Sequence, residues 1–228
     1  MRLIFVRHGE PDYENKCLTP LGYKQAEVLV DRLKDEGITE IHTSTLERAI
    51  MTAEPIAKKL GLDITKHEFI NEVGGASTDG TELPEGGHPW RMARALISQG
   101  IDLCREDWAD TEPYCHSKLT ESYSRVADGI DAFLAELGYV REGRYYRVCR
   151  PTKKNVALFS HCGSSTAALC RILNIAFPYA LGNLIVPKHT AVTVLRFSGN
   201  EGDLIAPVIE VMNDAAHING IETDGLML

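Results

Sequence analysis

The sequence predicts an α/β fold, a three-layer sandwich in which a mostly parallel central sheet is covered by helices on both faces. Two observations predict it. Residues 3–6 and 156–159 are continuous apolar runs, which are typical of strands buried on both faces of a parallel sheet. Segments with apolar residues at helical spacing alternate with short strand-like runs along the chain. We therefore expect a single domain over residues 1–228.

The first half of the chain is expected to alternate three strands with two helices. Thr19 and Pro20 suit the N-cap and the first turn of the first helix, because a hydroxyl can accept a backbone N–H there and proline lacks that donor. Gly61 suits the end of the second helix. The expected elements are strands at 3–6, 40–43 and 63–70 and helices at 19–35 and 46–60.

The second half contains one segment without a clear period. Residues 76–120 are rich in Gly, Pro and acidic side chains, which predicts an inserted cap of short helices and loops and not a second full domain. Residues 141–154 carry several basic side chains and two tyrosines, and we expect a solvated loop or an edge region there. The other expected elements are helices at 120–137 and 165–173 and strands at 156–159, 190–197 and 205–212.

The composition limits the possible functions. The chain has 24 Lys and Arg against 32 Asp and Glu, a net charge of -8. An acidic protein lacks the positive field of a general nucleic-acid or acidic-membrane binder, so we expect neither partner. No apolar segment reaches the length of a membrane span or a signal sequence. The six cysteines are scattered without a CxxC pair, which indicates reduced thiols and a cytoplasmic protein.

Charged side chains gather at one predicted edge of the sheet. His8 and His161 each follow one of the apolar strands, and the carboxyl ends of parallel strands are where ligands bind in such folds. Arg7 precedes the first histidine, and Arg48 lies one turn into a helix that leaves the same edge. Two histidines and two arginines make a site for a compact dianion, because guanidinium donors match phosphate oxygens. Taken singly, each could instead be a packing histidine or a surface charge.

Four segments in this order resemble the histidine phosphatase superfamily, whose fold is phosphoglycerate mutase-like. The resemblance covers most of the chain apart from residues 76–120 and the tail. The segments are Arg7-His8-Gly9-Glu10, residues 18–26 at the start of the first helix, Ser44 to Ala53 with Arg48, and Ser160-His161.

The resemblance implies an enzyme, a phosphoric monoester hydrolase of the histidine acid-type. His8 would be the nucleophile and form a phosphohistidine. Arg7, Arg48 and His161 would bind the phosphoryl oxygens, with His161 as a charged donor. Glu72 would be the general acid, with a pKa raised by the neighbouring phosphate. No metal ion and no cofactor are expected.

The chain departs from the family pattern in three places. Pro11 and Glu14 stand where many members have a Ser or Thr and an Asn, with Asn15 one position later. Cys162 follows the second histidine where Gly is usual, although backbone N–H groups at that helix start can still bind the phosphate. The longer Trp- and Asn-bearing stretch of the mutase branch is absent, which favours a phosphatase.

Three other functions remain open. A cysteine-dependent phosphatase would use Cys162, but the arginine that it needs six residues later is Ala168. A cofactor-dependent phosphoglycerate mutase-type enzyme would return the phosphoryl group to its substrate. A non-catalytic phosphate-binding module would need a damaged set of catalytic residues.

The substrate is expected to be a small phosphate monoester, and sugar phosphates, nucleotide or cofactor-precursor monophosphates and phosphoamino acids all fit. The segment 76–120 is where we expect specificity, with His88, Trp90, Trp108 and His116 as possible lining residues. The sequence does not predict an oligomeric state. The other histidines are expected to be surface or packing residues; in the whole chain these are His42, His67, His88, His116, His189 and His217.

Overall fold

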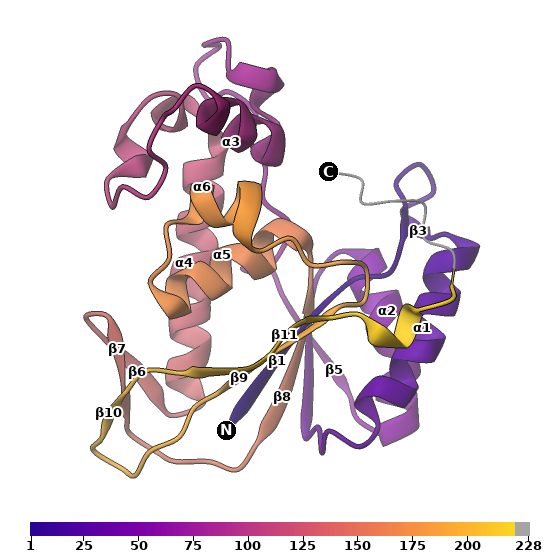
Figure 1. Ribbon diagram of the computed structural model, residues 1–228. Helices are drawn as coiled ribbons and strands as arrows, with labels where there is room; N and C mark the ends of the chain where they lie inside the picture. Colours follow the sequence, from indigo (N-terminus) through magenta and orange to yellow (C-terminus); the bar gives the residue numbers. More distant parts are fainter. Residues whose placement is uncertain (222–228) are drawn as a thin grey trace.

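A computed structural model describes residues 1–221 of the chain. Its central sheet is built from β1 (Arg2–Arg7), β4 (Glu40–Ser44), β5 (Ile64–His67), β8 (Asn155–Ser160), β9 (Val192–Arg196) and β11 (Val208–Asp214). The strand order is β11-β9-β1-β8-β4-β5 (Figure 1). β1, β8, β4 and β5 run parallel, while β9 is antiparallel to both β1 and β11. The predicted mostly parallel sheet is confirmed.

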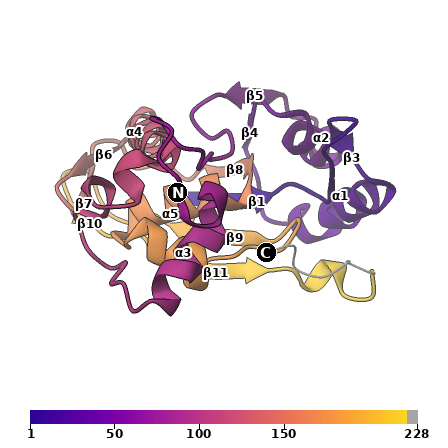
Figure 2. The ribbon, with the colours of Figure 1, turned by 90° about the horizontal axis from the view of Figure 1, so that it is seen from above.

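Helices cover both faces of this sheet, as predicted. α1 (Pro20–Leu33) and α2 (Glu47–Leu60) lie on one face, and α4 (Lys118–Glu136) and α5 (Cys162–Leu173) lie on the other (Figures 1 and 2). Alternate side chains of β1 enter the two cores: Leu3 and Phe5 pack with α4 and α5, and Ile4 and Val6 pack with α1 and α2. Burial on both faces explains why these strands are apolar throughout.

The segment between β5 and α4 covers the carboxyl end of the sheet with short elements. These are η1 (Pro84–Gly87), α3 (Pro89–Ser98), η2 (Trp108–Asp110) and η3 (Tyr114–His116). α3 packs on α6 (Phe177–Tyr179) and on the π-helical turn η4 (Ala180–Leu184) that follows it (Figure 1). Met92, Ala93 and Leu96 of α3 belong to the same hydrophobic core as α4 and α5.

The solvated loop considered for residues 141–154 is wrong for residues 141–142 and 145–148, which lie in strands, and holds for the turn and coil between and after them. The alternative, an edge region, agrees with the first of these strands, which lies at the edge of its sheet. β6 (Tyr139–Glu142) and β7 (Tyr145–Val148) form a hairpin, and β10 (Leu204–Ile205) pairs with it in a three-stranded sheet. Tyr146 and Val148 are fully buried while Tyr145 is exposed, so the segment alternates as a half-buried strand does. The basic side chains between them concealed this alternation.

Two further differences concern short elements. The sequence did not predict α6 and η4, the small hairpin of β2 (Pro11–Asp12) and β3 (Cys17–Leu18), or η5 (Ala216–Ile218). α5 begins at Cys162, three residues before the expected start, because the Ser164 hydroxyl accepts the His161 backbone N–H and caps the first turn. Within residues 1–221 no helix is long and apolar enough to span a bilayer. Residues 222–228, which end the predicted domain, lie outside the described residues.

Candidate active site

His8 stands at the carboxyl end of β1 and is only 2% exposed. Its Nδ1 lies 2.6 Å from the Gly9 carbonyl oxygen, which can only accept a hydrogen bond. Nδ1 therefore carries the proton, and Nε2 keeps a free lone pair. Burial, followed by the charges of His161, Arg7 and Arg48, holds the pKa of His8 well below its usual value. The ring is therefore a neutral base with a fixed tautomer.

The Gly9-Glu10 turn that follows His8 packs backbone to backbone against the start of α1. A Cβ atom on Gly9 would lie 2.7 Å from the Gly22 carbonyl oxygen, and one on Gly22 would lie 2.2 Å from the Glu10 carbonyl oxygen. The Glu10 carboxylate accepts the Thr19 hydroxyl, which in turn accepts the Gly22 N–H. Both glycines are thus sterically required, and Glu10 supports the helix cap.

His161 directly follows β8 and is the N-cap of α5, and its ring centroid lies 5.1 Å from that of His8. Its Nε2 lies 2.8 Å from Ser44 Oγ, and that hydroxyl also accepts the Leu46 N–H. Nδ1 is buried and has no partner among the described residues. Burial first, and then nearby arginine charges, lower the pKa of His161 far below its usual value. The ring is therefore neutral here, unlike the charged donor expected from the resemblance.

Arg7 and Arg48 bring two guanidinium groups to the histidines. Arg7 Nη1 donates to the Pro187 carbonyl oxygen at 2.6 Å. Arg48 lies in the first turn of α2, where the Thr52 hydroxyl donates to its carbonyl oxygen at 2.6 Å. The Nε atoms of both arginines are buried without a hydrogen-bond partner in the part of the chain that the structure describes. Such donors are available to an anion.

Glu72 follows β5 and reaches the start of α5. Its Oε1 accepts the backbone N–H groups of Val73 and Ser164, each at 2.9 Å. Arg125 of α4 holds the loop by donating to the carbonyl oxygens of Asn71 and Glu72. Burial raises the pKa of Glu72, and the backbone donors and the Arg7 charge oppose that rise. The direction agrees with a general acid, although here burial is the cause.

Cys162 is the first residue of α5 and is buried. Burial raises the pKa of its thiol to about 11, so it stays protonated at neutral pH and is a poor nucleophile. Ala168, six residues later, is fully buried and has no charged group to offer. The structure therefore disfavours the cysteine-dependent mechanism. Gly163 directly follows Cys162. A Cβ atom at Gly163 would lie 2.8 Å from Glu72 Oε1 and would displace the carboxyl group.

Several residues at the site were missed from the sequence. The hydroxyl of Ser44 positions His161, and the side chain of Asn71 holds Thr45. Arg125 positions the loop that carries Glu72. No local sequence pattern around these three residues indicates their contacts. His189 was expected to be a surface or packing residue, but its ring centroid lies 5.8 Å from that of His8. The signal that would have found it is the antiparallel direction of β9, which begins at the edge where β1 ends.

Of the four aromatic and histidine residues considered in the 76–120 segment, Trp90 lies nearest to this site. A Cβ atom on Gly163 would be 3.4 Å from its ring. Trp108 is buried edge-on against Tyr114 instead. His116 pairs with Asp79 at 2.7 Å on an exposed turn, and the His88 ring neighbours that of Trp90.

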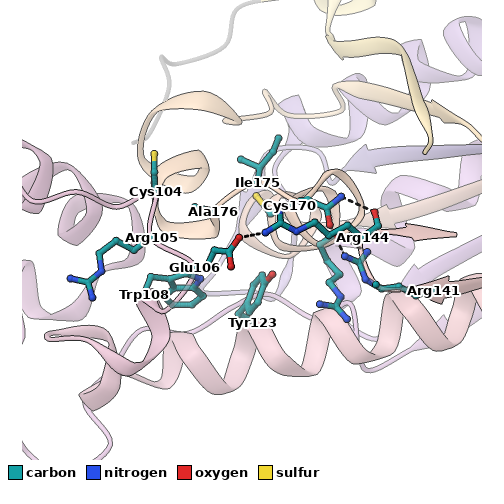
Figure 3. A pocket seen from close by; sticks show the side chains of 13 residues that line it. Cys104, Arg105, Glu106, Trp108, Tyr123, Arg141, Arg144, Cys170, Ile175 and Ala176 are labelled. Carbon is teal, nitrogen blue, oxygen red and sulfur yellow. Dashed lines mark hydrogen bonds and ion pairs between the residues drawn. The ribbon is translucent and has the colours of Figure 1, made fainter. Parts of the chain in front are cut away.

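Two cavities differ in what their arginines contact. A cavity of about 330 Å³ adjoins Arg48 and is lined by the β2–β3 hairpin and the start of α2. A second, of about 350 Å³, lies between α4, α5 and the β6–β7 hairpin (Figure 3). In the second, Arg171 pairs with Asp131 and Arg144 pairs with Glu106. Arg141, whose Nε makes no hydrogen bond among the described residues, lies 3.8 Å from the same Asp131. Each of these three arginines has a carboxylate beside it, so the site at His8 is the better phosphate site.

The fold and this site together define an α/β phosphate-binding enzyme. The model of the histidine phosphatase superfamily (branch 1) matches residues 3–209, so the chain belongs to this superfamily. Phosphoserine phosphatase 1 of Hydrogenobacter thermophilus is 25% identical over 187 residues, 77% of each chain. The protein named "Probable phosphoglycerate mutase GpmB" of Proteus mirabilis is 32% identical over 233 residues, 98% of each chain.

Solved structures share the fold. Phosphoserine phosphatase of Entamoeba histolytica, as a mutant with phosphoserine, has a TM-score of 0.61 at 21% identity and covers 95% of this chain and 98% of its own. Mycobacterial glucosyl-3-phosphoglycerate phosphatase has a TM-score of 0.62 at 21% identity and covers 93% and 98%. The family and these relatives support phosphomonoester hydrolysis by a phosphatase, and the mutase and the non-catalytic module are not favoured.

Proposed function

We propose that the chain hydrolyses phosphate monoesters of small metabolites in two displacements, through a phosphohistidine on Nε2 of His8. The observation that carries the proposal is the state of this histidine. Its Nδ1 proton is bound to the Gly9 carbonyl oxygen, its ring is neutral, and it lies among the cations Arg7 and Arg48. A nucleophile of this kind can attack phosphorus without first losing a proton.

In the first step, His8 Nε2 forms a bond to phosphorus while the bond from phosphorus to the alcohol oxygen breaks. Glu72 gives its proton to the departing oxygen, and Arg7, Arg48 and His161 bind the phosphoryl oxygens. In the second step, water attacks phosphorus and gives a proton to the Glu72 carboxylate, and the phosphorus–nitrogen bond breaks. Neutral His8 and inorganic phosphate result. The backbone N–H of Cys162 lies at the same helix start and is proposed as a further phosphate donor.

The proposed substrate is a small phosphorylated metabolite. Within the phosphatases, we propose that the enzyme is of the histidine acid-type. Tyr13, Lys16 and Glu47 line the cavity beside Arg48. Because this cavity adjoins the proposed phosphoryl site, it would take the alcohol part of the substrate. Relatives are named for phosphoserine and for glucosyl-3-phosphoglycerate, so phosphorylated amino acids and sugar acids are the first compounds to assay. The six free cysteines support the cytoplasmic setting that we propose.

The experiment is a panel of phosphate monoesters assayed for released phosphate in the presence of EDTA. The wild-type protein should turn over, and His8→Ala should lose about 10³-fold or more of kcat/KM. Cys162→Ser is the matched control and should keep its activity. Loss in Cys162→Ser with activity retained in His8→Ala would overturn the proposal. Isomerised product without released phosphate would indicate the mutase instead.

A second measurement tests the general acid. Glu72→Gln cannot give a proton to the leaving oxygen, so its kcat on alkyl phosphates should fall by about 10²–10⁴-fold. The loss on p-nitrophenyl phosphate should be far smaller, because p-nitrophenolate leaves without protonation. Equal losses on both substrates would remove Glu72 from this role.

A further inference from the structure

His189 lies in the segment that leads from η4 into β9. Val6 of β1 pairs with Val192 of β9 in antiparallel register, so the residues before Val192 meet the carboxyl end of β1. The ring centroids of His189 and His8 are 5.8 Å apart, and those of His161 and His8 are 5.1 Å apart. The nucleophilic ring therefore has a second imidazole neighbour at nearly the distance of the first.

The segment that carries His189 is fixed to the strands on both sides. The Pro187 carbonyl oxygen accepts from Arg7 Nη1, and the Thr190 N–H donates to the Arg7 carbonyl oxygen at 3.1 Å. The Lys188 N–H donates to Asn213 Oδ1 of β11 at 3.0 Å. One short segment thus positions both the Arg7 guanidinium and the His189 ring.

Thr190, the next residue, has a φ of 54°, which is unusual for a β-branched side chain. Its hydroxyl donates to the His189 carbonyl oxygen at 2.8 Å and lies 3.0 Å from His217 Nε2. Backbone strain of this kind persists where the surrounding contacts over-determine a conformation, and it concentrates at functional sites. Here the strained residue directly follows the one whose ring centroid lies 5.8 Å from that of His8.

The chemical state of His189 suits a hydrogen bond to an anion. Burial, and then the charge of Arg7, lower the pKa of the ring to about 3, so it is neutral and carries one N–H donor. The Thr190 hydroxyl donates to the carbonyl oxygen of His189, and within residues 1–221 the His189 ring makes no hydrogen bond. The donor is therefore available to a bound molecule.

We propose that His189 is a third histidine of the phosphate site, and that its ring N–H donates to an oxygen of the phosphoryl group during transfer to and from His8. The proposal rests on the proposed function. The transferring group spreads its charge over three equatorial oxygens, and each gains from a fixed donor. His189 would bind them together with Arg7, from the segment that also holds that guanidinium.

The experiment compares His189→Phe, which keeps a flat ring without a donor, with His189→Gln, which keeps an N–H donor. Steady-state kinetics on p-nitrophenyl phosphate are combined with calorimetric affinities for inorganic phosphate and orthovanadate. His189→Phe should lose about 10–100-fold in kcat/KM, with a parallel loss in affinity for orthovanadate. His189→Gln should recover most of both. If the Phe variant does not fold, His189→Leu and His189→Asn make the same comparison with smaller side chains.

Retention of kcat/KM within about threefold in His189→Phe would overturn the proposal. So would equal losses in the Phe and Gln variants with unchanged anion affinity, since that result indicates packing alone. Failure of the proposed function has a different outcome, in which the wild-type protein releases no phosphate or His8→Ala remains active. Even then, the calorimetric affinities decide whether His189 binds phosphate.

Discussion

Two groups of arginines among the described residues differ in what their guanidinium groups contact. In the hollow of Figure 3, Arg171 lies 2.7 Å from Asp131, and Arg144 pairs with Glu106. At the carboxyl edge of the sheet, Arg7 and Arg48 have buried Nε atoms without a hydrogen-bond partner among the described residues. In the first arrangement both arginines have a carboxylate partner, and even Arg141, whose Nε makes no hydrogen bond there, lies 3.8 Å from Asp131. Arg7 and Arg48 have no carboxylate at ion-pair distance among the described residues, so they keep donors for an anion.

The difference separates stability from function. Asp131 lies beside the hollow of Figure 3, where it accepts from Arg171 and from the Tyr146 hydroxyl, and Arg141 contacts the same tyrosine. Half-buried cations without a carboxylate at ion-pair distance are unfavourable in the free protein, because their desolvation is not fully offset. Proteins keep such groups where binding requires them, so the arrangement at Arg48 favours function over stability.

The largest expected effect is on catalysis. Arg48→Met removes one phosphoryl donor and should lower kcat/KM by about 10²–10³-fold. The matched variant Arg144→Met removes an arginine from the hollow of Figure 3 and should stay within about twofold of wild type. Kinetics with one phosphate monoester measures both. Comparable losses in the two variants would mean that the arginines do not differ in role.

The next effect is on stability and has the opposite pattern. Asp131→Ala leaves Arg171 and the Tyr146 hydroxyl without their acceptor, and should lower the free energy of unfolding by about 1–3 kcal/mol. Arg48→Met should leave that free energy unchanged or raise it. Urea denaturation measures both variants, and kcat/KM below the transition should be normal for Asp131→Ala. A destabilised Arg48→Met would contradict the comparison.

The sequence identified the residues at strand ends but not those that position them. His8 and His161 were found because the carboxyl ends of parallel strands share one edge of the sheet. Ser44 and Arg125 act through contacts between elements distant in the sequence, which no local pattern indicates. The place of His189 beside His8 depends on the direction of β9, which is set by the pairing of strands in the sheet.

The same reasoning applies to the fold. The two-sided apolar runs predicted the parallel strands well, because burial on both faces leaves little choice of side chain. The β6–β7 hairpin was missed, since its buried residues Tyr146 and Val148 alternate with Tyr145 and Arg147 over only four positions. Short elements packed on one side carry too few residues for a period to be recognised.

The smallest expected effect is a shift in the titration of the nucleophile. Burial comes first among the causes that lower the pKa of His8, and the charges of His161, Arg7 and Arg48 follow. Arg48→Met removes one of these cations, which favours the protonated ring, so the pKa of His8 should rise toward its ordinary value of about 6.5. Arg144→Met should not move it.

NMR titration of the His8 ring measures this shift directly. Because its pKa is lowered, wild-type His8 should stay neutral as the pH falls below about 6.5, and only stronger acid should protonate the nucleophile. In Arg48→Met, protonation should begin at a higher pH, and the acid limb of kcat should move with it. An unshifted His8 in that variant would show that burial alone sets its charge, and that the unpaired arginines bind substrate without tuning the base.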